Sequence, residues 1–224
     1  MADQTDREPR DADQALRFFG RMSASVSHEL NNIMTIILEK SGLMTDLAWA
    51  MENGRELNPE RVREIGESFS RQARRGIELL KHFNHFAHSV DDPAVTFELK
   101  ALVENIARLA ERFAALKKLD MKTELDEAGL NIHGDPFAIR HIIFSCLEAA
   151  MAPLAPGGVI TISARGAGGD ALVHISAAPP PEPALPREIV DSAIKQARTQ
   201  GAFLDVTHGA DAVVMTLTIP RGAC

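Results

Sequence analysis

Apolar side chains recur at alternating steps of three and four in the first part of the chain, and this spacing limits the fold more than any other feature. The first series is Leu16, Phe19, Val26, Leu30, Ile33, Ile37, Met44 and Leu47. Such spacing places the side chains on one face of an α-helix, which we expect over residues 13–52. Asn53-Gly54 ends this helix, because both residue types readily adopt the left-handed conformation that follows a helix C-terminus.

A second helix begins at Asn58-Pro59, where the asparagine serves as the cap and the proline occupies the first turn. The three-four spacing resumes there, at Val62, Ile65, Phe69, Gln72, Gly76, Leu79, Phe83 and Phe86. The sequence therefore predicts a helical hairpin over residues 12–90, preceded by a flexible tail at 1–11. Two helices cannot enclose both stripes alone, so we expect a homodimer whose hairpins form a four-helix bundle.

The period changes after Asp91-Asp92-Pro93, which predicts a domain boundary before residues 94–224. Strands are predicted over 95–99, 120–125, 159–165, 171–177, 202–207 and 212–219, and helices over 100–118, 135–154 and 187–199. Glycines between the third and fourth strands indicate a hairpin. The fold class is therefore α+β: a helical hairpin followed by an α/β sandwich, with an antiparallel or mixed sheet and helices on one face.

Composition narrows the function further. The formal net charge of −7 argues against nucleic acid as a partner, because phosphate binding requires a basic surface. No apolar run is long enough for a membrane span, and the first ten residues are too polar for a signal peptide. Cys146 and Cys224 form no disulfide framework. We therefore expect a cytoplasmic protein with neither a membrane nor a nucleic-acid partner.

His28 and Glu29 stand in the first helix without an evident structural reason. His28 lies two residues after Val26 and two before Leu30, so its ring turns away from the apolar stripe and is expected to be accessible. The Glu29 carboxylate can hydrogen-bond one ring nitrogen and leave the other free to attack phosphorus. The pair therefore suits a nucleophilic histidine with an orienting base.

Residues 25–32, Ser-Val-Ser-His-Glu-Leu-Asn-Asn, resemble the H-box in the dimerisation and phosphotransfer domain of histidine kinases. The resemblance implies that His28 is the phosphoacceptor and that Glu29 assists as a base. It also implies that Asn32 positions water when a response regulator is dephosphorylated. The match departs from the commonest family pattern, which ends in a proline, because Asn32 is followed by Ile33 and the helix continues.

The second half resembles the ATP-binding domain of the same family, with residues 134–150 matching the helix that carries its N-box. Ser145 and Ala149 stand where that helix has asparagines, and no aspartate or glycine of the adenine pocket follows Ala177. An alanine cannot ligate a metal. The resemblance therefore implies a degenerate nucleotide site and no cofactor of the chain's own, with Mg²⁺ supplied by a partner receiver domain.

Other side chains offer weaker candidates. His82, His85 and His88 recur at steps of three, but a metal site is the less favoured interpretation. Antiparallel pairing of the two helices instead puts the region near residue 82 level with His28, so that Lys81, His82 or His85 flanks a phosphoryl group. On the same helix, Arg71, Arg74 and Arg75 are expected to pair with Glu67 and Glu78. Three apolar residues after the H-box are expected to contact the receiver: Ile33, Met34 and Ile37.

The favoured hypothesis is a phosphorelay histidine phosphotransferase, in which His28 carries a phosphoryl group between receiver-domain aspartates without ATP. Its partners would be response-regulator receivers and a second copy of the chain. Two enzymatic alternatives remain, a divergent histidine kinase and a response-regulator phosphatase acting through Glu29 and Asn32. A third alternative is a non-catalytic dimeric scaffold that sequesters a two-component partner.

Overall fold

The structure, a computed structural model, describes residues 7–91, 93–125, 129–181 and 184–220, and side chains from residue 12 onward. Contacts divide the chain into two units. One is the hairpin of residues 20–84, and the other combines the chain up to Phe19 with the chain from His85 onward. This division differs from the boundary expected at 91–93, because the start of the first helix groups with the α/β part.

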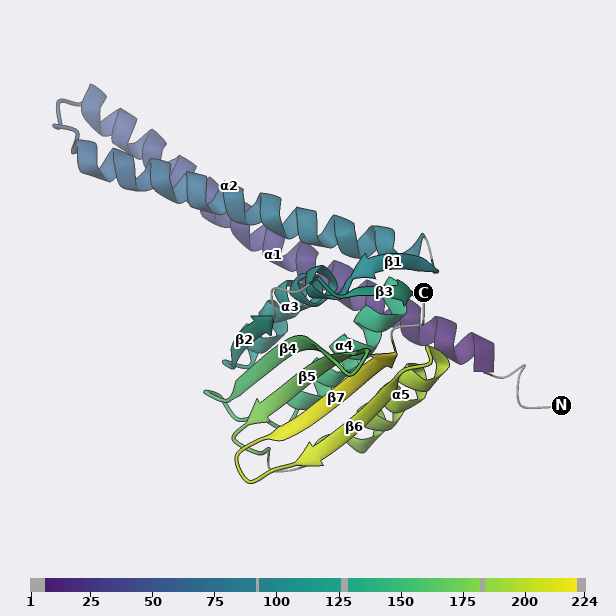
Figure 1. Cartoon of the computed structure of the whole chain (residues 1–224). Coiled ribbons are helices and arrows are strands. Elements are labelled where there is room, and N and C mark those ends of the chain that lie inside the picture. The colour runs from purple at the N-terminus through teal and green to yellow at the C-terminus, as the bar shows by residue number, and fades with distance from the viewer. Residues whose placement is uncertain (1–6, 92, 126–128, 182–183, 221–224) are drawn as a thin grey trace. The chain divides into compact units, whose positions relative to one another are not determined.

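Helices α1 (Arg7–Glu52) and α2 (Pro59–Ala87) form the hairpin, and a short 3-10 helix, η1 (His88–Val90), follows (Figure 1). Helix α1 begins earlier than predicted, so residues 7–11 are helical rather than part of a flexible tail. At its C-terminus, Gly54 has φ +79° and Arg55 N–H donates to the Ala50 carbonyl at 3.0 Å. This is the Schellman arrangement, which needs a left-handed residue such as glycine after the last turn.

The predicted cap at Asn58 is present, because Asn58 Oδ1 accepts a hydrogen bond from Glu60 N–H at 2.9 Å. Within the hairpin, Ile33 is fully buried and approaches Gly76 of α2 closely. A Cβ atom built at Gly76 would lie 3.7 Å from Ile33 Cγ2, an ordinary van der Waals distance, so Ile33 packs against α2 at this position. The three-four stripe thus provides buried residues of the hairpin, among them Val26, Ile33, Ile65 and Leu79. At the start of α1 the predicted stripe was wrong, because Leu16 is 70% exposed.

The second unit contains a two-stranded sheet and a five-stranded sheet. Strands β1 (Val95–Glu98) and β3 (Asn131–Gly134) pair antiparallel. The larger sheet has the order β2-β4-β5-β7-β6, in which β2 and β4 are parallel and all other neighbours are antiparallel. Its strands are β2 (Asp120–Leu125), β4 (Val159–Ala167), β5 (Asp170–Ala178), β6 (Phe203–His208) and β7 (Val213–Pro220).

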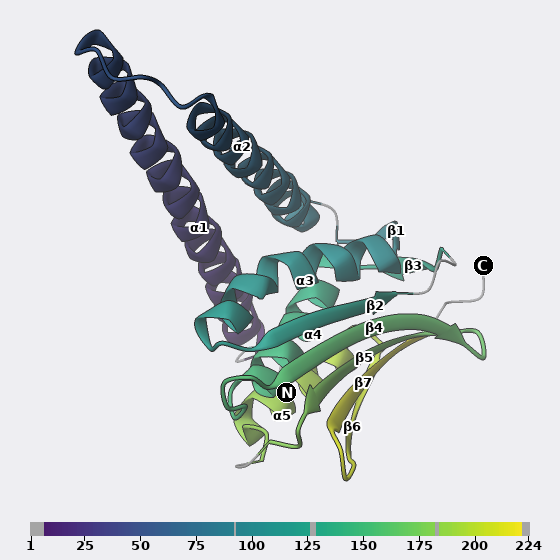
Figure 2. The same cartoon turned by 90° about the vertical axis from the view of Figure 1, so that its left-hand side faces the viewer.

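Helices α3 (Leu99–Leu116), α4 (Pro136–Met151) and α5 (Arg187–Thr199) lie over one face of the larger sheet (Figure 1, Figure 2). Burial alternates along β4, β5 and β7, because successive side chains point to opposite faces. The inner face is filled by aliphatic side chains such as Ile162, Ile175 and Leu217. Each contributes about 1.5–3 kcal/mol relative to an exposed position. The predicted α+β class is confirmed.

Aromatic side chains join the start of α1 to α4. Phe18 is 3% exposed, and its ring stacks on His141 with centroids 4.6 Å apart and planes 8° apart. Phe86, Phe137 and Phe144 surround the same ring at centroid distances of 5.3–5.4 Å. We call these five residues the Phe18 cluster. It explains why α1 up to Phe19 groups with the α/β unit.

Candidate functional site

Helix α1 presents a polar face that contains the predicted phosphoacceptor. His28 is exposed, whereas Val26 is 4% exposed, so the expected orientation of the imidazole is confirmed. Asn32 and Thr35 are also exposed, and they follow His28 at steps of four and three on the same face. Thr35 Oγ1 donates to the Asn31 carbonyl at 2.8 Å. Helix α1 runs without a break through Ile33, the position at which the commonest family pattern has proline.

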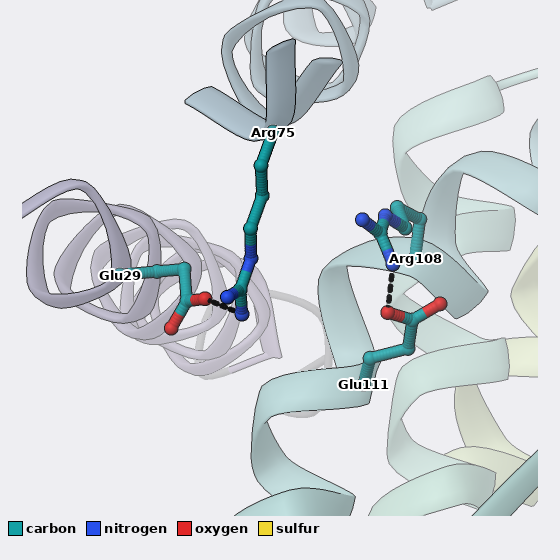
Figure 3. Close-up of polar contacts among 4 residues, drawn as sticks. All are labelled: Glu29, Arg75, Arg108 and Glu111. Carbon is teal, nitrogen blue, oxygen red and sulfur yellow. Dashed lines mark hydrogen bonds and ion pairs between the residues drawn. The ribbon is translucent and has the colours of Figure 1, made fainter. Parts of the chain in front are cut away.

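The Glu29 side chain lies between the polar face of α1 and helix α2 of the same hairpin. Its side chain is 16% exposed, and its Oε1 accepts a hydrogen bond from Nη2 of Arg75 on α2 (Figure 3). The Arg75 side chain remains 51% exposed. The carboxylate of Glu29, which follows His28 in the sequence, is therefore held by a cation from the other helix of the hairpin.

Sequence spacing did not predict this ion pair. The expected partner of Arg75 was a glutamate on its own helix, and of those pairings Arg71 with Glu67 is present, at 3.6 Å. A pair four residues apart follows from helix geometry alone. A pair between α1 and α2 depends on how the two helices align, which no local pattern encodes. Figure 3 also draws a pair of the local kind within α3, Arg108 with Glu111.

Two contacts fix the alignment of the helices at the site, Glu29 with Arg75 and Ile33 with Gly76. Together they place residues 76–81 of α2 opposite His28. His82 follows this stretch directly and is half-buried, while His85 is exposed and belongs to the other unit. The roles expected for His82 and His85 stay predictions.

The three apolar residues expected to contact a receiver differ in exposure. Met34 is 52% exposed and Ile37 is half-buried. Ile33 is fully buried, so its place among the contact residues was wrong. The three-four stripe already put Ile33 on the inner face, and its packing against Gly76 leaves no surface for a partner.

The three residues that stand at the positions of the family's nucleotide-binding residues lie inside the α/β unit. Ser145 is 8% exposed, Ala149 is fully buried and Ala177 is 1% exposed. Nearby on α4, Arg140 is buried and donates from Nε to Asn105 Oδ1 at 3.1 Å and from Nη1 to the Pro136 carbonyl at 3.2 Å. Burial lowers the pKa of Arg140 to about 10, and the Asp135 carboxylate acts in the opposite direction. These contacts serve the packing of α3 against α4.

Metal and membrane features were sought throughout the described ranges. There, no three His, Cys, Asp or Glu side chains gather in a way that would hold a metal ion. No helix within those ranges has the length and apolar character that a membrane crossing requires. Burial raises the pKa of the Cys146 thiol to about 12, which keeps it protonated and unreactive.

Comparisons with known proteins support the fold. No protein-family model matches the chain, and no curated protein matches its sequence. A histidine kinase from Burkholderia phymatum STM815 matches with a TM-score of 0.51 at 13% identity, over 92% of this chain and 98% of its own. The Acinetobacter baumannii histidine kinase AdeS matches with a TM-score of 0.50 at 12% identity, over 88% and 98%. The architecture is therefore histidine-kinase-like.

Proposed function

We propose that this chain is a phosphorelay histidine phosphotransferase that passes a phosphoryl group between receiver-domain aspartates through His28. The observation that carries the proposal is the polar face of α1 in a histidine-kinase-like fold. There an exposed imidazole adjoins a carboxylate held by Arg75, and Asn32 lies one turn further on. A solvated surface would not need the carboxylate to be fixed from the neighbouring helix.

The transfer needs few protein groups. A His28 ring nitrogen uses its lone pair to form an N–P bond with the aspartyl phosphate of the receiver. The O–P bond breaks, and its electron pair stays on the aspartate as a carboxylate. Glu29 accepts the proton from the other ring nitrogen. Mg²⁺ held by the receiver neutralises the phosphoryl oxygens, and the reverse sequence passes the group to a second receiver.

The α/β unit supports transfer without ATP, because the residues at the corresponding positions do not fit a nucleotide. Methyl side chains at Ala149 and Ala177 offer neither a ligand for Mg²⁺ nor an acceptor for an adenine amino group. Both side chains are buried, at 0% and 1% exposure, and Ser145 is buried as well. The proposed transfer therefore uses no ATP.

The hairpin presents apolar surface that a second copy would cover. The exposed apolar side chains of the hairpin include Met34 and Leu38 on α1, four residues apart, and Ile77 and Leu80 on α2, three apart. Their exposed fractions run from 44% to 74%. Such stripes on both helices suit a four-helix bundle between two hairpins, so we propose a homodimer.

Asn32 favours a second activity of the same site. Its amide is exposed on the face that carries His28, one helical turn away. An amide at that place can orient a water molecule toward the aspartyl phosphate of a docked receiver. The chain would then also hydrolyse the phosphoryl group of a receiver, and Asn32→Ala would slow this hydrolysis while leaving the transfer to His28 in place.

The deciding experiment presents purified wild-type chain with a panel of phosphorylated receivers and, separately, with labelled ATP. Label should pass from a receiver to wild type and not to His28→Ala, and ATP should label neither. His208→Ala, which removes an exposed histidine of the α/β unit, is the matched control and should accept label like wild type. Efficient labelling by ATP would contradict the proposal. A His28→Ala chain that still regulates the partner's output would instead favour the scaffold.

A further inference from the structure

We infer that Arg75 is a further catalytic residue of the phosphotransfer site: it holds Glu29 in place for His28 and donates its other N–H groups to the phosphoryl group. This inference rests on the proposed function and goes beyond it, because the H-box resemblance assigns no role to α2 at this position. The observation is the ion pair between Glu29 and Arg75 across the hairpin (Figure 3).

The geometry of a guanidinium suits both tasks at once. Arginine has five N–H donors in a planar fork, so one nitrogen can hold a carboxylate while others reach an anionic oxygen. In this structure Nη2 holds Glu29 Oε1, and half of the Arg75 side-chain surface faces solvent. The phosphoryl group would arrive at the adjacent residue on α1, His28, whose side chain is exposed to the same solvent.

The charges change in a direction that favours this arrangement. Before transfer, the Arg75 cation is paired with the Glu29 carboxylate. When the N–P bond forms, the site gains the negative oxygens of the phosphoryl group while Glu29 takes up the ring proton. A fixed cation beside developing negative charge lowers the barrier without requiring groups to reorganise. Arg75 would then stabilise phosphohistidine as well as orient the base.

A structural role for the pair predicts a different result. An ion pair with one half-exposed partner contributes little to folding, so its loss should leave the melting temperature close to wild type. If Arg75 only supported docking by its charge, its removal would raise the receiver concentration needed for half-maximal transfer. If Arg75 positions Glu29, the maximal transfer rate falls instead.

The test measures transfer from one phosphorylated receiver to four forms of the full-length chain: wild type, Arg75→Gln, Arg75→Lys and Arg74→Gln. Arg74→Gln removes the same charge from the neighbouring exposed residue, about 100° around the helix, and serves as the matched control. We expect Arg75→Gln to lower the maximal rate about tenfold to a hundredfold, with half-saturation and melting temperature close to wild type. Arg75→Lys should recover only part of the rate, because an ammonium lacks the fork.

A double variant separates action through Glu29 from an independent effect. Glu29→Gln combined with Arg75→Gln should cost less than the product of the two single losses, because the residues act as one unit. A rate for Arg75→Gln within about twofold of Arg74→Gln would overturn the inference. Full activity in Arg75→Lys would show that the site does not need the planar fork of a guanidinium. A wild-type chain that takes no label from any receiver would instead refute the proposed function.

Discussion

His174 is a residue of the larger sheet whose pKa makes the stability of the fold depend on pH. It lies on β5, the middle strand of the larger sheet, and its Nδ1 is 3.0 Å from Thr216 Oγ1 on β7. Desolvation by burial, together with the positive charge of Arg165, lowers the pKa of His174 below its ordinary value of 6.5. The folded chain therefore takes up this proton less readily than the unfolded chain does.

Stability should fall on acidification through this residue. Above about pH 6.5 both states hold a neutral imidazole, and below it the unfolded state gains a proton first, so the free energy of unfolding decreases. Between about pH 7.5 and about pH 5.5, the melting temperature of His174→Gln should fall less than that of wild type. Thermal unfolding followed by circular dichroism measures this difference, with the exposed His208→Gln as the control. Equal losses in wild type and His174→Gln would remove His174 as a cause.

Among the separate elements, α4 depends on its cap. Asp135 precedes Pro136, and its Oδ1 accepts hydrogen bonds from the N–H groups of Phe137 and Ala138, both at 2.9 Å. The carboxylate also faces the positive end of the helix dipole. These contacts satisfy backbone donors that would otherwise lack partners at the start of a buried helix.

Removal of that cap should destabilise the α/β unit. Asp135→Ala should lower the free energy of unfolding by about 1–2 kcal/mol, whereas Asp135→Ser keeps an acceptor and should retain most of it. Chemical denaturation of the two variants in parallel gives the comparison. If serine is no better than alanine, the hydrogen bonds to Phe137 and Ala138 do not hold the helix start.

The local sequence pattern predicted most of the helices and strands, and the exception shows what such a pattern cannot detect. The second strand was predicted at 120–125 and is observed as Asp120–Leu125, and the helix predicted at 187–199 is α5. Strand β3 was missed, because Asn131-Ile-His-Gly134 is short and lacks the β-branched and aromatic run of a typical strand. Its pairing with β1 supplies the stability that its own residues do not.

The same limit applies to the site. The helical period predicted that His28 is exposed, because the direction of one side chain depends only on its own helix. The pairing of Glu29 with Arg75 was not predictable, since it joins residues from two helices through long side chains. Near the start of α1 the period was wrong: it put Leu16 on the inner face, but Leu16 is 70% exposed and Phe18 is buried instead. The element that covers Phe18 lies far along the chain, which no local period encodes.

For the whole molecule, the exposed stripe of the hairpin determines the oligomeric state we expect. Ile77→Lys combined with Leu80→Lys should convert a dimer into a monomer, because charged side chains oppose burial at a helix interface. Size-exclusion chromatography with light scattering measures the mass. Leu116→Lys is the control, since Leu116 is 69% exposed on α3 of the other unit. A wild-type chain that is monomeric at all concentrations would contradict the proposed bundle.

The Phe18 cluster should matter more to stability than any exposed aromatic. Phe18→Ala removes a ring that contacts four others, and such truncations cost about 3–5 kcal/mol. Thermal unfolding should therefore shift strongly for Phe18→Ala and little for Phe203→Ala, whose side chain is 58% exposed. Similar shifts in the two variants would show that α1 is not held through Phe18.

The Phe18 cluster also has a consequence for synthesis on the ribosome. Phe18 emerges early, but its partners Phe137, His141 and Phe144 are added only after both hairpin helices and α3 have been made. At ordinary translation rates this delay is on the order of ten seconds. During that interval the hairpin can form from its own contacts, while Phe18 lacks three of its four ring partners and has only Phe86 of α2 available. Phe18 can therefore reach its final environment only after α4 has left the ribosome.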